Sequence, residues 1–154
     1  MLKRLIPQTA PLHPEEEQWL DLSAITVEVT SEQPDRPIEH ALLDHDRRGW
    51  RAATPGVQTI RLLFEDPQDV RRIVLRFDES AVARTQEFAL RWSRGPGALR
   101  EIVRQQWNFS PRGATCELED FRADLKGVRS LELTINPDIT GAEAYASITS
   151  FCVA

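Results

Sequence analysis

The side chains most suited to chemistry gather in one polar loop, which has the sequence DHDRRGW at positions 44–50. Catalytic and transition-metal sites use a histidine between two carboxylates, but they need three or four groups that converge on one point. The other histidines, His13 and His40, show no ligand spacing relative to His45. The sequence also contains no nucleophile elbow, phosphate-binding loop or dinucleotide fingerprint. We therefore predict that the protein is not an enzyme.

Arginine and tryptophan side chains offer binding chemistry instead. Guanidinium groups donate paired hydrogen bonds to carboxylates, phosphates and sugar hydroxyls, and a tryptophan ring can stack on a sugar. The candidate ligand-binding residues are Arg47, Arg48 and Trp50 in the first loop and Arg94 in the turn at 94–97. Packing beneath the loop is the alternative for Trp50, and we expect core packing for Trp92 and Trp107.

Further arginines fall on the outward phase of the predicted strands: Arg61, Arg72, Arg76, Arg91 and Arg104. One sheet face rich in guanidinium groups could be a platform for an anionic or hydroxylated ligand. The alternative is a solvated face with cross-strand ion pairs. The carboxylates for such pairs lie on neighbouring strand phases: Glu28, Glu117, Glu119 and Glu132.

Alternation of apolar and polar residues predicts the strands that must position these side chains. They are expected within 24–30, 59–64, 70–77, 88–93, 101–109, 115–121, 130–135 and 146–153. The segment 65–69 is expected to end one of them, and only 36–43 and 141–145 could hold a helical turn. About eight short strands separated by turns predict an all-β fold, an antiparallel β-sandwich or jelly roll. Residues 1–23 are interpreted as an irregular lead-in and 24–154 as a single domain.

Composition narrows the range of partners. The net charge of -5 and the pI of about 5.3 argue against nucleic-acid binding, which needs a basic surface. No apolar run has the length of a membrane span, and we find no export signal, so a cytoplasmic location is expected and no membrane partner is predicted. Cys116 and Cys152 form no metal or redox motif and are interpreted as buried free thiols.

The order of three segments resembles the galactose-binding-like jelly rolls, which include discoidin (coagulation factor 5/8 type C) domains and many carbohydrate-binding modules. The segments are ALLDHDRRGW at 41–50, GVQTIRLLFEDPQDVRRIVLRF at 56–77 and TQEFALRWSRG at 85–95. The chain is also similar to bacterial proteins known only as carbohydrate-binding. Three features depart from the family pattern: Gln58 replaces a tryptophan, His45 replaces a glycine, and the cysteine pair of discoidin domains is not matched.

The resemblance implies a structural calcium ion in the first loop, where Asp44 and Asp46 would be ligands. Calcium takes six to eight oxygen ligands. Relatives commonly add an acidic residue near the C-terminus, but the segment 147–154 contains none. The alternative is that both aspartates hydrogen-bond loop amides, and no other cofactor is predicted.

The leading hypothesis from the resemblance is a non-catalytic carbohydrate-binding module that holds a glycan through loops at one end of the sandwich. The alternative is an intracellular protein-interaction or scaffold domain of the same fold. The lack of an export signal and the unpaired cysteines favour this alternative. One fold hosts many functions, so the choice depends on the site.

Overall fold

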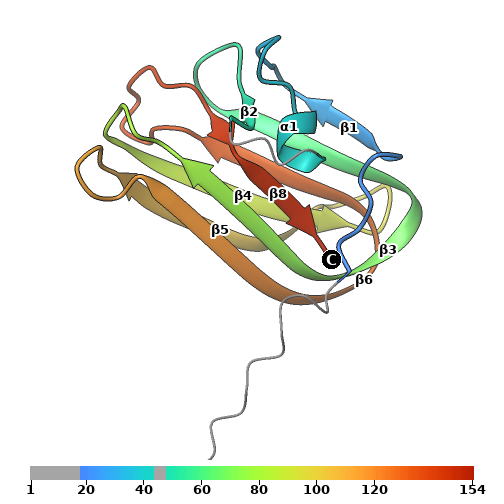
Figure 1. The fold of residues 1–154 in the computed structure, drawn as a ribbon. Helices are drawn as coiled ribbons and strands as arrows, with labels where there is room; N and C mark the ends of the chain where they lie inside the picture. Colours follow the sequence, from blue (N-terminus) through green and yellow to red (C-terminus); the bar gives the residue numbers. More distant parts are fainter. Residues whose placement is uncertain (1–17, 44–47) are drawn as a thin grey trace, which may run out of the picture.

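The computed structural model describes residues 18–43 and 48–154, and they form an antiparallel β-sandwich (Figure 1). In those residues the elements are β1 (Thr26–Val29), α1 (Glu39–Leu42), β2 (Trp50–Arg51), β3 (Gln58–Asp78), β4 (Arg84–Ser93), β5 (Arg100–Phe109), β6 (Cys116–Asn136), β7 (Ser147–Ile148) and β8 (Ser150–Val153). Each pair of neighbouring strands is antiparallel. The predicted all-β class is confirmed.

Strands β3 and β6 are each 21 residues long and replace four of the shorter strands that the sequence predicts. The prediction that 65–69 ends a strand is wrong. The register between β3 and β6 shifts between Leu63 and Gln68 and again before Arg72. Pro67, which has no N–H to donate, falls within this irregular stretch, so it removes no bond from the regular ladder. The chain therefore bends at the proline without leaving the sheet.

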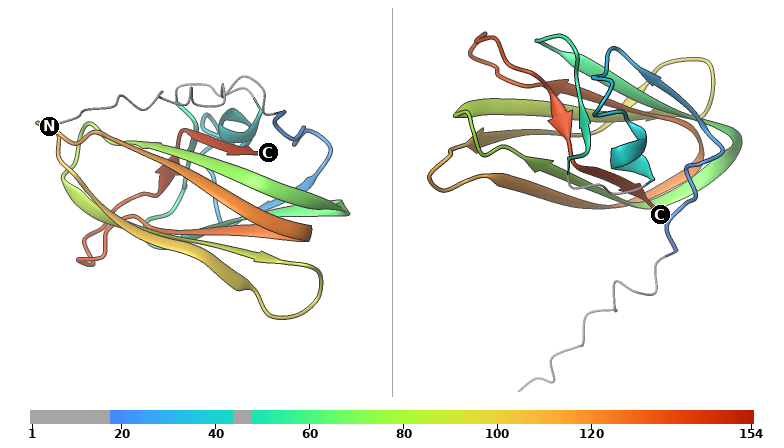
Figure 2. Two further views of the ribbon diagram at one scale, coloured as in Figure 1. Left: turned by 90° about the horizontal axis from the view of Figure 1, so that it is seen from below. Right: turned by 45° about the horizontal axis from the view of Figure 1, so that its top comes forward.

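The bend lets β3 and β6 take part in two layers. Residues 58–63 of β3 pair with β1 and with the second half of β6, to which β4 and β5 are added. Residues 72–78 of β3 pair with the first half of β6, and β8 adds to the other edge. Figures 1 and 2 show both long ribbons curving round at the same end of the molecule. The two layers are thus continuous through one bent hairpin.

Large apolar side chains fill the space between the layers. The rings of Phe77 and Phe88 stack across it with centroids 5.3 Å apart. Trp92 is 7% exposed, and Trp107 packs against the core while partly buried, so the expected core role of both is confirmed. The end of the predicted lead-in also docks, because Leu22 is buried and the Leu20 N–H donates to the Val153 carbonyl over 2.8 Å.

One part of the core is polar. The Arg84 guanidinium, 5% exposed, donates to Glu79 Oε1, Gln86 Oε1 and the Pro137 carbonyl, each over 2.9 Å. Gln86 is fully buried and donates in turn to Glu117 Oε2 over 3.2 Å. This network ties β4 to β6 and to the segments that follow β3 and β6, and it satisfies donors that burial would otherwise leave unpaired.

The predictions for helical turns and for the cysteines are confirmed only in part. The helical turn expected within 36–43 is present as α1, whereas 141–145 is irregular and contains no helix. Both cysteines are free, but the interpretation as buried thiols is wrong, since Cys116 is exposed and Cys152 is half-buried. Within 18–43 and 48–154, no helix has the length and hydrophobicity needed to cross a membrane.

Candidate functional site

Three of the predicted site residues, Asp44, Asp46 and Arg47, lie outside the described residues. Calcium binding by the two aspartates therefore stays a prediction. Among the residues that the structure describes, no three His, Cys, Asp or Glu side chains converge on a metal site.

Trp50 does not belong to a ligand surface. Its side chain is fully buried, and the indole Nε1 donates to the Ser31 carbonyl over 3.2 Å. A ring without exposed surface cannot stack on a sugar, so the prediction that Trp50 binds ligand is wrong. A structural role, the alternative from the sequence, agrees with this burial.

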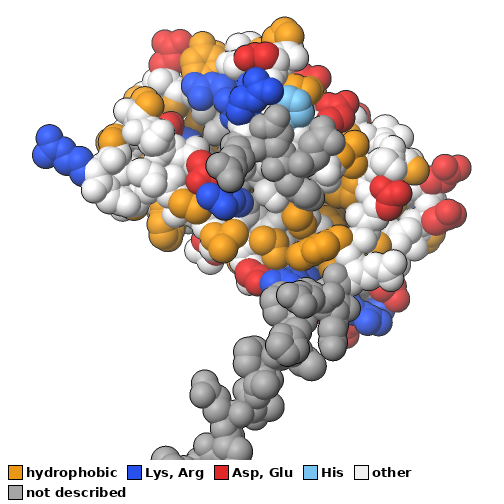
Figure 3. All heavy atoms as spheres, viewed as in Figure 1, with side chains coloured by type: hydrophobic (Ala, Val, Ile, Leu, Met, Phe, Trp, Pro, Cys, Tyr) orange, Lys and Arg blue, Asp and Glu red, His pale blue; other side chains and the backbone are white. Residues whose placement is uncertain are grey.

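Arg48 is exposed and lies next to Gly49, which packs against the backbone of Ile148 and Thr149. Arg36 belongs to the same region, because its Nε donates to the Gly49 carbonyl over 3.2 Å. In Figure 3, basic side chains gather near the top of the face, over the place that β2 and α1 occupy in Figure 1. Arg48 is therefore part of a basic region around β2.

Arg94 lies elsewhere, in the turn between β4 and β5. Its Nε donates to the Lys126 carbonyl over 3.0 Å, where β6 bends beside Asp69 of β3. The Arg48 region is tied instead to Arg76, because the neighbouring Thr149 N–H donates to the Arg76 carbonyl over 2.8 Å. The strand from Asp69 to Arg76 spans roughly 20 Å. The prediction that Arg48 and Arg94 contribute to one site is therefore wrong, because the structure holds them at different places.

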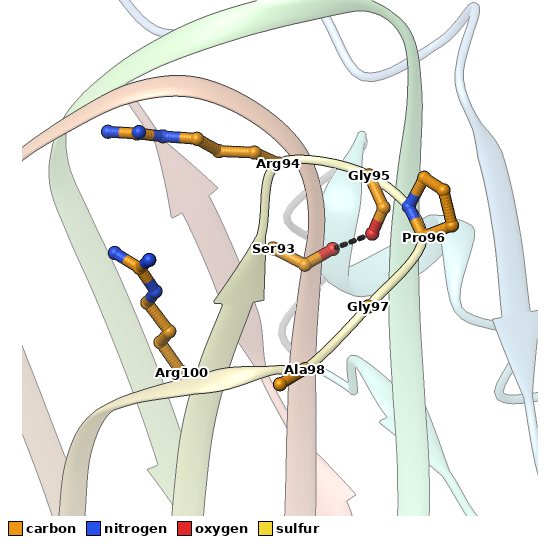
Figure 4. A pocket seen from close by; sticks show the side chains of 7 residues that line it. All are labelled: Ser93, Arg94, Gly95, Pro96, Gly97, Ala98 and Arg100. Carbon is orange, nitrogen blue, oxygen red and sulfur yellow. Dashed lines mark hydrogen bonds between the residues drawn. The ribbon is translucent and has the colours of Figure 1, made fainter.

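The β4–β5 turn forms an open pocket of about 270 Å³ (Figure 4). We call it the turn pocket, and its lining residues are Ser93, Arg94, Gly95, Pro96, Gly97, Ala98 and Arg100. The Ser93 hydroxyl donates to the Gly95 carbonyl over 3.1 Å and lies 2.7 Å from the Ser130 hydroxyl. Because Ser93 has a single hydroxyl proton, Ser130 is the donor in that second contact. These bonds fasten the turn to β6.

Two guanidinium groups flank one aromatic ring at this pocket. The Cζ atoms of Arg94 and Arg100 lie 5.4 and 5.7 Å from the ring centroid of Trp92, within the range of a cation–π contact. Figure 4 shows both arginine side chains extending to the same side of the hairpin. The pocket therefore presents two positive groups held over a buried tryptophan.

Sequence reasoning selected Arg94 but missed Arg100. The two strands pair Trp92 with Arg100, and this pairing places the Arg100 side chain on the same side of the sheet as Trp92. A register shift follows Leu90, which pairs with Val103 while Arg91 pairs with Glu101. Alternation in β5 changes phase at this bulge. Pairing the residues of the two strands outward from the β4–β5 turn would have placed Arg100 opposite Trp92.

The arginine-rich sheet face consists of ion pairs. One row of alternating charge, the charge row, crosses five strands in register: Glu28, Arg61, Glu132, Arg91 and Glu101. Arg61 lies 3.2 Å from Glu28 and 2.9 Å from Glu132. The other predicted arginines also have carboxylate partners: Arg72 with Asp120, Arg76 with Asp78, and Arg104 with Glu87. Cross-strand ion pairs are confirmed for Arg61, Arg72, Arg91 and Arg104, although Arg72 is buried rather than solvated. Arg76 pairs within its own strand, and it lies with Arg72 in the other layer.

Two carboxylates that were expected on that face lie elsewhere. Glu117 points into the core and is 1% exposed, and Glu119 is half-buried beside it. Burial, together with the nearby Glu119 carboxyl, raises the pKa of Glu117 to about 8. Its Oε1 atom has no donor among the described residues. Glu117 is therefore a protonated acid at neutral pH and can donate to Glu119.

Replacing Glu132 with glutamine is expected to lower the free energy of unfolding by about 1–3 kcal/mol. The Glu132 side chain is 7% exposed and accepts from two donors of Arg61, so the variant loses a shielded, charge-assisted acceptor. Glu28, with 54% exposure, is the matched control, and Glu28→Gln should cost below about 0.5 kcal/mol. Urea denaturation at pH 7 measures both, and equal losses would contradict the role given to burial.

Solved structures with the same fold include carbohydrate-binding modules of family 32. The module of Clostridium perfringens NanJ, in complex with galactose, superposes with a TM-score of 0.64 at 15% identity over 88% of this chain and 96% of that chain. The Clostridium perfringens module CpGH89CBM32-5, in complex with GalNAc-beta-1,3-galactose, gives a TM-score of 0.65 at 18% identity over 88% and 99%. The family 32 module of AlyQ, in complex with 4,5-unsaturated mannuronic acid, gives 0.58 at 17% over 90% and 98%.

No protein-family model and no curated protein sequence matches this chain. The structural likeness, at identities below 20%, shows the fold. The chain has the galactose-binding-like jelly-roll fold of family 32 carbohydrate-binding modules, as the order of the sequence segments predicts.

Proposed function

We propose that this protein is a non-catalytic carbohydrate-binding module. The observation that carries the proposal is the fold, which matches sugar-bound modules over 88% of this chain and at least 96% of each of the two Clostridium perfringens modules. A match of that extent aligns the described chain with whole binding modules. Carbohydrate binding is therefore the function that the fold supports best.

The turn pocket is the site we propose for the glycan. Sugar hydroxyls need directed hydrogen bonds, and Arg94 and Arg100 supply guanidinium donors on the same side of one hairpin. Both guanidinium groups also contact the Trp92 ring, which restricts the freedom of the two side chains. The pocket is smaller than the roughly 300–1,000 Å³ typical of drug-sized ligands, which suits one sugar residue at a chain end.

A glycan array, followed by titration calorimetry on the glycans that bind, tests the module function. Binding of at least one glycan at millimolar concentration or below supports it. No binding on the array, together with a protein partner that co-purifies stoichiometrically, would overturn it in favour of the scaffold alternative.

The double variant Arg94→Ala/Arg100→Ala is expected to weaken binding of the best glycan by about tenfold or more, because charge-assisted hydrogen bonds are lost. Arg112 provides the matched control, since it is an exposed arginine in the loop that follows the other end of β5. Arg112→Ala should leave the Kd unchanged by calorimetry. Unaltered affinity in the double variant would place the glycan outside the turn pocket.

A further inference from the structure

The arginines around the β4–β5 turn differ in their partners from the five arginines that the sequence predicts on a sheet face. Each of those five has a carboxylate within 4.0 Å: Arg61, Arg72, Arg76, Arg91 and Arg104. Arg94, Arg100 and Arg129 have none among the residues of 18–43 and 48–154. Arg129 belongs to this group because its Cδ would lie 3.9 Å from a Cβ at Gly95, and its Nη1 donates to the Glu65 carbonyl over 2.9 Å. The turn therefore concentrates positive charge in a protein of net charge -5.

The donors of these arginines are only partly used. The Nε of Arg94 donates to the Lys126 carbonyl, so the two terminal nitrogens of its guanidinium are left to donate to a ligand. The Arg100 side chain contacts the Trp92 ring and makes no hydrogen bond within the described part of the chain. Two parallel N–H groups at the end of a guanidinium match the two oxygens of a carboxylate or the oxygens of a sulfate. The pocket thus retains paired donors beside the Trp92 ring.

The side chains of the turn pocket offer donors without acceptors. Its lining includes no Asp, Glu, Asn or Gln, and the Ser93 hydroxyl is already bonded to Gly95 and Ser130. A neutral sugar hydroxyl both donates and accepts, whereas a carboxylate or sulfate only accepts. An acceptor-only group can therefore be satisfied here by side chains, while a hydroxyl would leave its proton to water or backbone oxygen. The lining selects for negative charge.

We infer that the turn pocket binds a glycan through an anionic substituent, a carboxylate or a sulfate ester, which Arg94 and Arg100 hold while Arg129 adds to the local positive potential. The inference rests on the proposed carbohydrate binding and specifies the chemical class of the ligand. Because the chain as a whole is acidic, general attraction to polyanions is weak, and recognition depends on this local group of arginines.

Titration by NMR with three probes tests the inference: methyl galacturonoside, its neutral methyl ester, and galactose 6-sulfate. The indole N–H of Trp92 reports on the pocket. At least one anionic probe should bind about tenfold more tightly than the ester, and a rise from 50 to 300 mM salt should weaken it. The better of the two anionic probes identifies carboxylate or sulfate as the substituent.

Arg94→Gln/Arg100→Gln should remove the preference for the anionic probe, whereas Arg112→Gln should keep it. Equal affinity for ester and acid, with no salt dependence, would overturn the anionic inference and leave the module function standing. Failure of all three probes would also overturn it, and the glycan array decides separately whether the protein binds other carbohydrates. Loss of signal in the Arg112→Gln control would contradict the placement of the site.

Discussion

The Gly49→Ala substitution is expected to lower the free energy of unfolding of the protein by roughly 3–5 kcal/mol. Gly49 has a φ of +59°, which L residues other than glycine adopt at a cost. An added Cβ would overlap the Ile148 carbonyl oxygen and lie 2.5 Å from Thr149 Cα. Both obstacles are backbone atoms, so the β2–β7 pairing of Trp50 with Ile148 must open to admit the methyl group.

Gly127→Ala is the control for the strain component alone. Gly127 has a similar φ of +67°, but a Cβ there meets nothing within 4 Å. Its replacement should cost only about 1–2 kcal/mol, the price of the left-handed conformation. Urea denaturation of the two variants separates strain from overlap. Similar losses in both would show that the contact with Ile148 and Thr149 relaxes freely.

The protein should become less stable as the pH rises from about 5 to 8, because of Glu117. Burial raises its pKa to about 8 in the folded state, from an ordinary value of 4.5. Below pH 4.5 both states hold the proton, so the stabilising contribution is fully present. Between the two values only the unfolded state releases the proton, and the free energy of unfolding falls by up to about 1.4 kcal/mol per pH unit.

Glu117→Gln is expected to remove this slope and to be the more stable protein at pH 8, by on the order of 3 kcal/mol. Glutamine copies the neutral acid: its oxygen can accept from Gln86, and its amide can donate to Glu119. Aspartates with lowered pKa values, such as Asp78 and Asp120, titrate below this pH window and do not mask the effect.

Thermal unfolding at several pH values between 5 and 8 measures the slope. Glu143→Gln, at an exposed position, is the control and should follow the parent protein at every pH. A Glu117→Gln variant whose Tm declined in parallel with the parent would show that Glu117 is ionised in the folded state, contrary to its burial.

Local sequence features were sufficient for the fold class and for part of the core. Alternation predicts a strand within 88–93 and the sequence analysis expects Trp92 in the core, and both predictions are confirmed. Alternation cannot tell whether two runs joined by a proline form two strands or one bent strand. That depends on the partner strand, and β6 continues past the irregular stretch of β3 at 65–69. The long strands were therefore missed.

For the site, the sequence supplied Arg94 and the glycine-containing turn, because turn residues and arginine chemistry are local properties. Tertiary structure decided that Arg48 and Arg94 are far apart, that Trp50 is buried, and that Arg100 pairs with Trp92. It also decided which arginines keep carboxylate partners. Strand pairing joins residues distant in the chain, such as Arg61 and Glu132. Which arginines lack a carboxylate partner in the described segments, as those at the β4–β5 turn do, is therefore known only from the folded structure.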